Sequence, residues 1–324
     1  MPKAVRIHET GGPEVLRFED FDPGEPGPGW VRIRHTAIGI NFIDTYHRSG
    51  LYPLPLPCGL GLEAAGVVEQ VGEGVETLRV GDRVAYGTGP IGAYSQVTVA
   101  PANRIVPIPA SVSDETAAAM MLKGMTAWFL LRRTYEVKEG DTILFHAAAG
   151  GVGLIACQWA KHLGATVIGT AGSEEKAALA REHGADHVIL YSTEDFPRRV
   201  RERTGGRGVP VVYDGVGKAT FEGSLDCLAP RGLMVSFGNA SGPPAPLELG
   251  MLALKGSLYV TRPTLMTYTA EDADLQEAAR ALFDVVGRGL VRVAVNQRYP
   301  LSEAAAAHRD LEARKTTGAS VLIP

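Results

Sequence analysis

A glycine-rich turn between a strand pattern and a helix pattern constrains the fold of this chain more than any other feature. Strand-forming residues 142–145 lead into Ala-Ala-Ala-Gly-Gly-Val-Gly at residues 147–153, and an amphipathic helix pattern follows. Glycine permits a tight turn and a close backbone approach, and the N–H groups at a helix start attract phosphate oxygens. This order is typical of a dinucleotide-binding βαβ unit. We expect the pyrophosphate to contact Gly150, Gly151, Val152 and Gly153.

The end of the next expected strand, residues 165–170, indicates which dinucleotide binds. NAD-binding folds usually place Asp or Glu roughly 20 residues beyond the glycines, where the carboxylate holds the ribose 2′-OH. Here small neutral residues that include Gly172 and Ser173 follow the strand, and Lys176 comes soon after. The two glutamates between Ser173 and Lys176 suit the first turn of a helix that Ser173 caps. The sequence therefore favours NADPH over NADH.

Length, charge and cysteine content limit the class of protein. The chain has 324 residues, enough for two domains, and its net charge of -4 gives no electrostatic footprint for nucleic acid. Three scattered cysteines do not make a disulfide framework and suit a reducing cytosol. No segment resembles a signal peptide or an apolar span. We expect a cytoplasmic protein with no nucleic-acid or membrane partner.

The order of patterns predicts two domains, one inserted into the other. Residues 1–123 carry short valine- and isoleucine-containing runs between glycines and prolines, which favours a β-rich, partly closed domain. Residues 124–261 alternate strand and helix patterns, as a parallel sheet requires. The strands expected there are 142–145, 165–170, 187–191, 211–214, 233–237 and 257–261, and the helices between them include 176–183 and 219–228.

The last zone, residues 262–324, contains helix patterns at 273–287 and 302–313 and a closing strand at 320–323. We find no partner for this strand within its own zone, so we expect it to join the sheet of the first zone. The predicted fold is α/β, with a doubly wound parallel sheet (124–261) inserted into a catalytic domain made of 1–123 and 262–324.

Several further motifs carry a resemblance to a known family. They are GINFIDTY at 39–46, RSGLYP at 48–53, GLEAAG at 61–66, VSFGN at 235–239 and GSLYVTRP at 256–263. With the glycine turn, they resemble the zeta-crystallin-like quinone oxidoreductases of the medium-chain dehydrogenase/reductase superfamily, over essentially the full length. The resemblance implies a GroES-like catalytic domain, a Rossmann domain, NADPH-dependent reduction of a small-molecule quinone, and a homodimer that pairs through edge strand 257–260.

The chain departs from the zinc branch of that superfamily. Zinc alcohol dehydrogenases carry a cysteine near segment 41–46 and a histidine where this chain has Leu62, which cannot coordinate a metal. No cluster of four cysteines is available for a structural zinc. We therefore predict a metal-free enzyme. Ketone reduction benefits from a Lewis acid, whereas conjugation in a quinone already spreads the incoming charge.

The resemblance also implies which residues line the site. Asn41, Phe42, Asp44 and Tyr46 would lie at the nicotinamide end of the cleft, with Tyr52 at its mouth. Asn41 would either bond a substrate carbonyl or hold the cofactor amide, and Asp44 is as readily an exposed N-terminal helix carboxylate. Asn41, Tyr46 and Tyr52 are the candidates for positioning the substrate, and no side chain is a compelling general acid. Lys123 is better explained as a helix lysine that extends to solvent.

The remaining expected cofactor contacts come from four places. Tyr191 and Arg314 would complete the 2′-phosphate site with Gly172, Ser173 and Lys176. Segments at the carboxyl ends of the fifth and sixth strands lie where open α/β sheets bind ligands. These residues are Phe237, Gly238, Asn239, Thr261, Arg262 and Pro263.

Two other functions stay open from the sequence alone. An NADPH-dependent enone or alkene reductase would share both fold and cofactor. A non-enzymatic NADPH-binding protein, crystallin-like or redox-sensing, would keep the nucleotide site without turnover.

Overall fold

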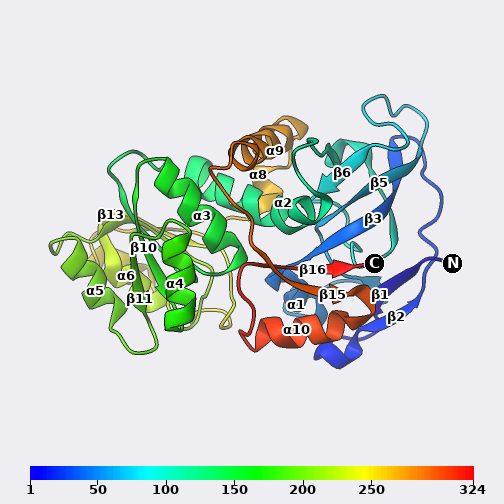
Figure 1. Ribbon diagram of the computed structural model, residues 1–324. Helices are drawn as coiled ribbons and strands as arrows, with labels where there is room; N and C mark the ends of the chain where they lie inside the picture. The colour runs from blue at the N-terminus through cyan, green and yellow to red at the C-terminus, as the bar shows by residue number, and fades with distance from the viewer. The chain divides into compact units, whose positions relative to one another are not determined.

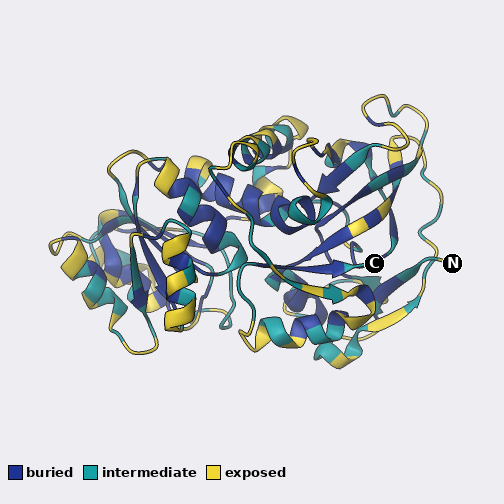
Figure 2. Ribbon diagram, viewed as in Figure 1, coloured by how far each residue is buried: buried dark blue, intermediate teal, exposed yellow.

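The computed structural model describes residues 1–324, which form two compact units. The first unit comprises Met1–Met125, Thr269–Gly287 and Val293–Pro324, and the second comprises Thr126–Tyr268 and Arg288–Arg292. Within each unit the inner strands of the sheets are mostly buried, whereas edge strands, helix surfaces and loops carry most of the exposed residues (Figures 1 and 2).

The first unit is built on two sheets. The larger has the order β15-β16-β3-β5-β6-β8, with β7 also paired to β3, and the smaller has the order β2-β1-β4. Their strands are β1 (Lys3–Ile7), β2 (Arg17–Asp20), β3 (Trp30–Ile40), β4 (Cys58–Gly59), β5 (Ala64–Val71), β6 (Arg83–Tyr86), β7 (Val97–Pro101), β8 (Val106–Pro107), β15 (Val295–Pro300) and β16 (Ala319–Ile323). The predicted β-rich first zone is confirmed.

Strand β3 organises the larger sheet because it pairs with β5, β7 and β16, all antiparallel. Its side chains alternate, and Val31, Ile33 and Ile38 are fully buried in one apolar core. The helices of this unit are α1 (Phe42–Ser49), α9 (Asp272–Gly287) and α10 (Ala304–Glu312), and α2 (Asp114–Phe129) begins in it. The expected helices 273–287 and 302–313 correspond to α9 and α10.

The C-terminal strand is found where we expected it, but one part of that expectation is wrong. β16 does pair with β3, through Ser320 opposite Ile40. It also pairs in parallel with β15, which belongs to its own zone. The sequence of β15, Val-Asn-Gln-Arg-Tyr-Pro, hides this strand because it lies at the sheet edge and its alternate residues are exposed.

The second unit is a six-stranded, all-parallel sheet with the order β11-β10-β9-β12-β13-β14. Counted along the chain, this is the 3-2-1-4-5-6 order of a doubly wound nucleotide-binding fold. The strands are β9 (Thr142–Phe145), β10 (Thr166–Ala171), β11 (His187–Leu190), β12 (Val209–Asp214), β13 (Leu228–Ser236) and β14 (Tyr259–Thr261). The predicted α/β fold class is confirmed.

Helices flank both faces of this sheet. α3 (Gly151–His162) and α4 (Glu174–Glu182) lie on one face, and α5 (Phe196–Arg203) and α6 (Phe221–Cys227) on the other (Figure 1). The shorter α7 (Leu249–Leu254) and α8 (Leu265–Tyr268) follow. Sequence analysis did not predict α5, because it carries four arginines and buries only Val200. Its start is set by Asp195, whose side chain accepts a hydrogen bond from the Arg198 N–H.

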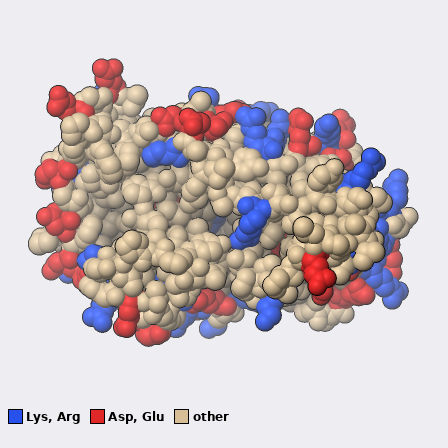
Figure 3. Space-filling view, turned by 180° about the vertical axis from the view of Figure 1, so that it is seen from behind, with Lys and Arg blue, Asp and Glu red and all other residues tan.

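The surface carries charges of both signs. On the face in Figure 3, lysine and arginine side chains are interspersed with aspartate and glutamate, and no extended region has one sign. No helix is both long and apolar enough to cross a bilayer.

Candidate active site

The first candidate site residues lie where β3 ends and α1 begins. Asn41 has extended backbone and caps α1, and its N–H donates to Asp44 Oδ2 at 2.8 Å. The helix ends at Gly50, whose φ of 82° closes the last turn. Asn41, Phe42, Asp44 and Tyr46 therefore share a short, fixed segment. Asp44 is the third residue of α1 and is fully buried, so the alternative of an exposed helix carboxylate is wrong.

A buried ion pair holds the Asn41 side chain. Glu63 Oε2 lies 2.8 Å from Lys123 Nζ and also accepts a hydrogen bond of 2.8 Å from Asn41 Nδ2. Its other oxygen, Oε1, accepts the Leu122 N–H at 2.9 Å. Glu63 is fully buried and Lys123 is only 5% exposed, so the expectation that Lys123 extends to solvent is wrong. The arrangement places an ammonium group beside the Asn41 amide.

Sequence reasoning missed this pair although a signal was present. Glu63 stands between Leu62 and Ala64 in an apolar segment that continues into strand β5. A carboxylate in such a segment requires a buried cation or several hydrogen-bond donors. Nothing in the sequence identified Lys123, sixty residues away, as that cation.

Asp44 is itself connected to the surface by a row of buried side chains. Tyr94 OH donates to Asp44 Oδ2 at 2.8 Å and lies 3.1 Å from His308 Nε2. His308 Nδ1 lies 3.1 Å from Arg48, which forms a two-pronged pair with Glu312 at 2.7 and 3.0 Å. Because arginine only donates, His308 Nδ1 accepts, and Nε2–H donates to Tyr94. The hydrogen bonds from Arg48 to His308, from His308 to Tyr94 and from Tyr94 to Asp44 therefore all run toward Asp44, while Arg48 also donates outward to Glu312.

Burial dominates the protonation of this row. It raises the pKa of the Asp44 carboxyl to about 7, although donors at Asn41 and Tyr94 and the charge of Lys123 act the other way. Burial, with the charge of Arg48, lowers the pKa of His308 to about 3. Asp44 Oδ1 is buried and has no hydrogen-bond partner. At neutral pH, His308 is uncharged and Asp44 is close to its midpoint.

Three aromatic rings gather on and just after α1. Tyr46 and Tyr52 meet edge to face, with centroids 5.2 Å apart, and the Tyr52 N–H donates to the Tyr46 carbonyl at 3.1 Å. The rings of Phe42 and Tyr46 are 6.3 Å apart. Tyr46 is 9% exposed, so most of its ring packs within the unit. Contact of these rings with a flat substrate stays a prediction.

In the second unit, the glycine turn has the geometry of a phosphate cradle. Ala147 takes a φ of 52°, Gly150 caps α3, and the Ala148 N–H donates to the Thr170 carbonyl at 3.0 Å. A Cβ at Gly153 would lie 2.4 Å from the Ala147 carbonyl oxygen, so only glycine fits there. The first N–H groups of α3 have no carbonyl partner within the helix. A pyrophosphate group fits these residues.

A network of buried polar side chains lies next to the glycine turn and holds the strand ends around it in place. His146, directly after β9, bonds Thr170 Oγ1 and Ser224 Oγ, each at 2.9 Å. Ser224 donates to Asp214 Oδ2 at 3.0 Å, and this carboxylate also accepts from Thr220 and two backbone N–H groups. Burial lowers the pKa of His146. The network ties the ends of β9, β10 and β12 together, and sequence analysis did not predict it.

The expected 2′-phosphate residues of this unit lie together at the ends of β10 and β11. Ser173 caps α4, and its Oγ accepts the Lys176 N–H at 3.3 Å. A Cβ at Gly172 would lie 2.8 Å from Tyr191 OH, so this corner is small. Arg314 belongs to the first unit, follows α10 and has a φ of 58°. Its contact with the cofactor stays a prediction.

The loops after β13 and β14 also come together. Arg262 donates to the carbonyl oxygens of Ser236 at 2.9 Å and Gly238 at 3.2 Å. A Cβ at Gly238 would lie 2.5 Å from the Gly215 carbonyl, so the loops after β12 and β13 approach closely. Phe237, Gly238 and Asn239 thus lie near the loop that contains Thr261, Arg262 and Pro263.

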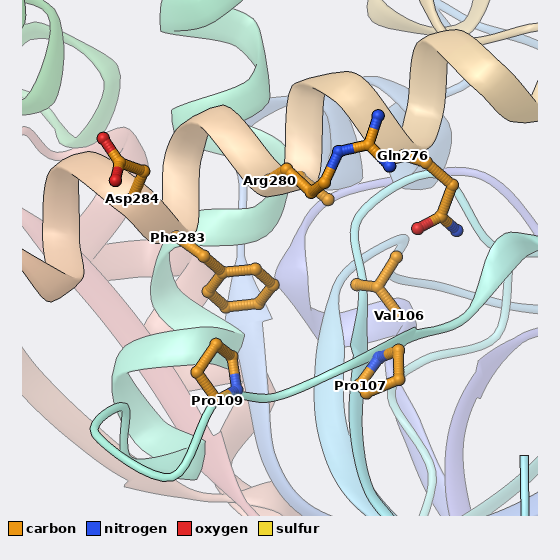
Figure 4. A pocket seen from close by; sticks show the side chains of 8 residues that line it. Val106, Pro107, Pro109, Gln276, Arg280, Phe283 and Asp284 are labelled. Carbon is orange, nitrogen blue, oxygen red and sulfur yellow. The ribbon is translucent and has the colours of Figure 1, made fainter.

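The first unit also has a surface pocket. It is formed by α9 and the segment around β8, with Phe283 above Pro109 and Gln276 above Val106 (Figure 4). None of the expected site residues lines it. No group of three or more His, Cys, Asp or Glu side chains is arranged to hold a metal ion.

Comparison with known proteins identifies the family. Residues 27–110 match the family described as alcohol dehydrogenase GroES-like domain, and residues 151–289 match the zinc-binding dehydrogenase family. A quinone oxidoreductase of Pseudomonas aeruginosa is 59% identical, with both chains covered completely. The chain belongs to the quinone oxidoreductase family of the medium-chain dehydrogenase/reductase superfamily. The predicted resemblance is confirmed.

Two further relatives bear on the activity. The crystal structure of Escherichia coli quinone oxidoreductase complexed with NADPH has a TM-score of 0.98 and 53% identity, and the match covers 99% of this chain and 100% of that one. A 2-haloacrylate reductase of Burkholderia is 49% identical and covers 100% of this chain and 99% of its own.

Proposed function

We propose that this protein is an NADPH-dependent quinone oxidoreductase that works without a metal. The observation that carries the proposal is the Gly150–Gly153 cradle at the start of α3, followed by a small, uncharged corner at Gly172, in a chain with full-length quinone oxidoreductase relatives. When bound, NADPH supplies a hydride, which a quinone accepts without a Lewis acid because conjugation spreads the charge. Turnover of quinones by chelator-treated protein is the test.

Different residues of the chain would bind different parts of the cofactor. Gly150, Gly151, Val152 and Gly153 would bind the pyrophosphate with backbone N–H groups. The Ser173 Oγ accepts the Lys176 N–H, which leaves its hydroxyl proton to donate to a 2′-phosphate. The cations of Lys176 and Arg314 and the Tyr191 hydroxyl would complete that site. Phe237, Gly238, Asn239, Thr261, Arg262 and Pro263 would border the rest of the dinucleotide at the carboxyl edge of the sheet.

The substrate would bind beside α1. Asn41 is held by Glu63, so its amide is fixed before substrate arrives. Tyr46 and Tyr52 would position the flat ring of the quinone, and Phe42 and Asp44 would line the nicotinamide end of the site. In this proposal, residues 1–123 and 262–324 act as the catalytic domain and residues 124–261 as the NADPH domain. The scattered cysteines support work in the cytoplasm.

We also propose a homodimer that forms through the second unit. β14 is the edge strand of the six-stranded sheet, and Tyr259 in it is 62% exposed. Leu249 and Leu254 at the two ends of α7 are 78% and 85% exposed. An open strand edge beside exposed leucines needs a partner, and a second copy can supply a matching edge.

Leu254→Glu tests this dimer. The change places a charge on the proposed interface, and we expect dimer association to weaken by at least about tenfold. Analytical ultracentrifugation at micromolar concentrations should show a dimer for the wild type and more monomer for the variant. Val80→Glu, at a residue that is 63% exposed in the first unit, is the matched control and should leave the mass unchanged. A monomeric wild type would contradict the proposal.

A further inference from the structure

Lys123 has a place in the site that the cofactor chemistry does not account for. Its ammonium group and the Asn41 amide both bond the same oxygen, Glu63 Oε2, each at 2.8 Å. Two donors that share one acceptor lie side by side. Glu63 takes one of the three N–H donors of the ammonium group, and one of the two on the amide. The remaining donors are available to an incoming oxygen.

The position of this cation in the fold is informative. Asn41 belongs to one segment, and Leu62 and Glu63 to the other, in which zinc dehydrogenases place metal ligands. Here a hydrogen bond from Asn41 to Glu63 joins the two segments, and Glu63 also holds the ammonium group of Lys123 beside them. The Lys123 side chain is 6% exposed and the Glu63 side chain 0%. A charge in such a water-poor setting acts on a neighbouring oxygen far more strongly than in bulk water.

We propose that Lys123 is a catalytic residue whose ammonium group contacts the substrate oxygen and stabilises the negative charge that develops there. This inference rests on the proposed quinone reduction. The hydride from NADPH brings two electrons and one hydrogen to the quinone and leaves a hydroquinone anion, whose negative charge gathers on an oxygen; a proton from solvent then completes the hydroquinone. Lys123 and the Asn41 amide, held in advance by Glu63, would donate to that oxygen. The ammonium group keeps all of its protons in this step.

The charges of Asp44, Glu63 and Lys123 make the expected kcat depend on pH. The groups that face Asp44 are the Asn41 N–H, Tyr94 OH, Lys123 and Glu63. Beyond Tyr94 lie His308, which is uncharged, and the guanidinium group of Arg48. When Asp44 is protonated, the carboxylate of Glu63 is the one negative charge that faces the ammonium group of Lys123. Burial raises the pKa of Asp44 to about 7, so a second negative charge appears above neutral pH. This charge opposes the developing anion and weakens the action of Lys123.

The variants must separate catalysis from folding, because Lys123→Met alone leaves the buried Glu63 charge without a cation. The double variant Lys123→Met with Glu63→Gln removes both charges and keeps a hydrogen-bond acceptor for Asn41. We expect it to fold and bind NADPH within about threefold of the wild type. Its kcat should fall on the order of 10²-fold, with a much smaller change in KM. Lys123→Arg, which keeps the charge, should retain more of kcat than the double variant.

A spectroscopic probe gives a readout that needs no turnover. 4-Nitrophenol is a planar phenol whose ionisation is visible by absorbance, and a nearby ammonium group favours its anion. Displacement by quinone shows that the probe occupies the substrate site. In the wild type, the bound probe should ionise at lower pH than the free probe. In the double variant this shift should disappear. An equal shift in the two proteins would overturn the proposal.

The pH profile provides the second arm. The wild-type kcat should fall about tenfold as pH rises from 6 to 8, since Asp44 ionises in that range. Asp44→Asn should abolish this dependence, and Tyr94→Phe should move it to higher pH because a donor to the carboxylate is lost. If the double variant turns over quinone within threefold of the wild type, the role of Lys123 is rejected but the proposed function is not. Failure of the wild type to reduce any quinone would reject the proposed function itself.

Discussion

Gly153→Ala is expected to lower NADPH affinity on the order of 10²-fold. The new Cβ would lie 2.4 Å from the Ala147 carbonyl oxygen and 2.7 Å from that of Ala148, and both neighbours are backbone atoms that cannot rotate away. The turn must therefore move, and the N–H groups that face the pyrophosphate move with it. The same overpacking should lower the free energy of unfolding by about 1–3 kcal/mol.

Fluorescence titration with NADPH and urea unfolding measure the two effects. Gly27→Ala is the matched control, because a Cβ there meets nothing within 4 Å, and both quantities should stay at the wild-type value. Gly150→Ala should lie between the two, since its Cβ would meet only the Ala147 oxygen, at 3.2 Å. Unchanged NADPH affinity in Gly153→Ala would show that this turn does not bind the cofactor.

Asp214→Ala should have the largest effect on stability, about 3–5 kcal/mol. The carboxylate is fully buried and accepts hydrogen bonds from the N–H groups of Val216 and Gly217 and the hydroxyls of Thr220 and Ser224, at 2.7 to 3.0 Å. Alanine leaves the two buried N–H groups without a partner and takes one acceptor from each hydroxyl. Because Ser224 also bonds His146 beneath the cradle, we expect weaker NADPH binding as well.

Urea unfolding followed by fluorescence tests this second prediction. Asp22→Ala removes a surface carboxylate and is the control, with a change within about 0.5 kcal/mol. Asp214→Asn keeps one acceptor oxygen and should lose less than Asp214→Ala. A loss below 1 kcal/mol in Asp214→Ala would mean that the buried donors find other partners.

The sequence predicts the second unit better than the first for a physical reason. Its central parallel strands are buried on both faces, so they appear as short apolar runs, and the range expected for β9 agrees with the structure. The glycine turn and the cap at Ser173 depend on neighbours within a few residues. Such local rules are readable from one chain.

Contacts between distant residues could not be predicted in this way. The Glu63–Lys123 pair and the Tyr94–His308 contact join residues 60 and 214 positions apart. Which carboxylate meets which cation depends on how β3, α2 and α10 pack, and a charged residue in an apolar segment says only that some partner exists. The edge strand β15 was missed because its polar residues suit an exposed edge and mimic a loop.

Turnover of quinones by metal-free protein tests the central claim most directly. After dialysis against a chelator, NADPH oxidation is followed with 1,4-benzoquinone, cyclohexanone and an acyclic enal, and then with NADH in place of NADPH. We predict rapid reduction of the quinone, unchanged by chelation, little reaction of cyclohexanone, and a preference for NADPH on the order of 10² in kcat/KM. Activity that is lost on chelation and restored by zinc, equal use of NADH, or a higher kcat/KM for the ketone or the enal than for the quinone would contradict it.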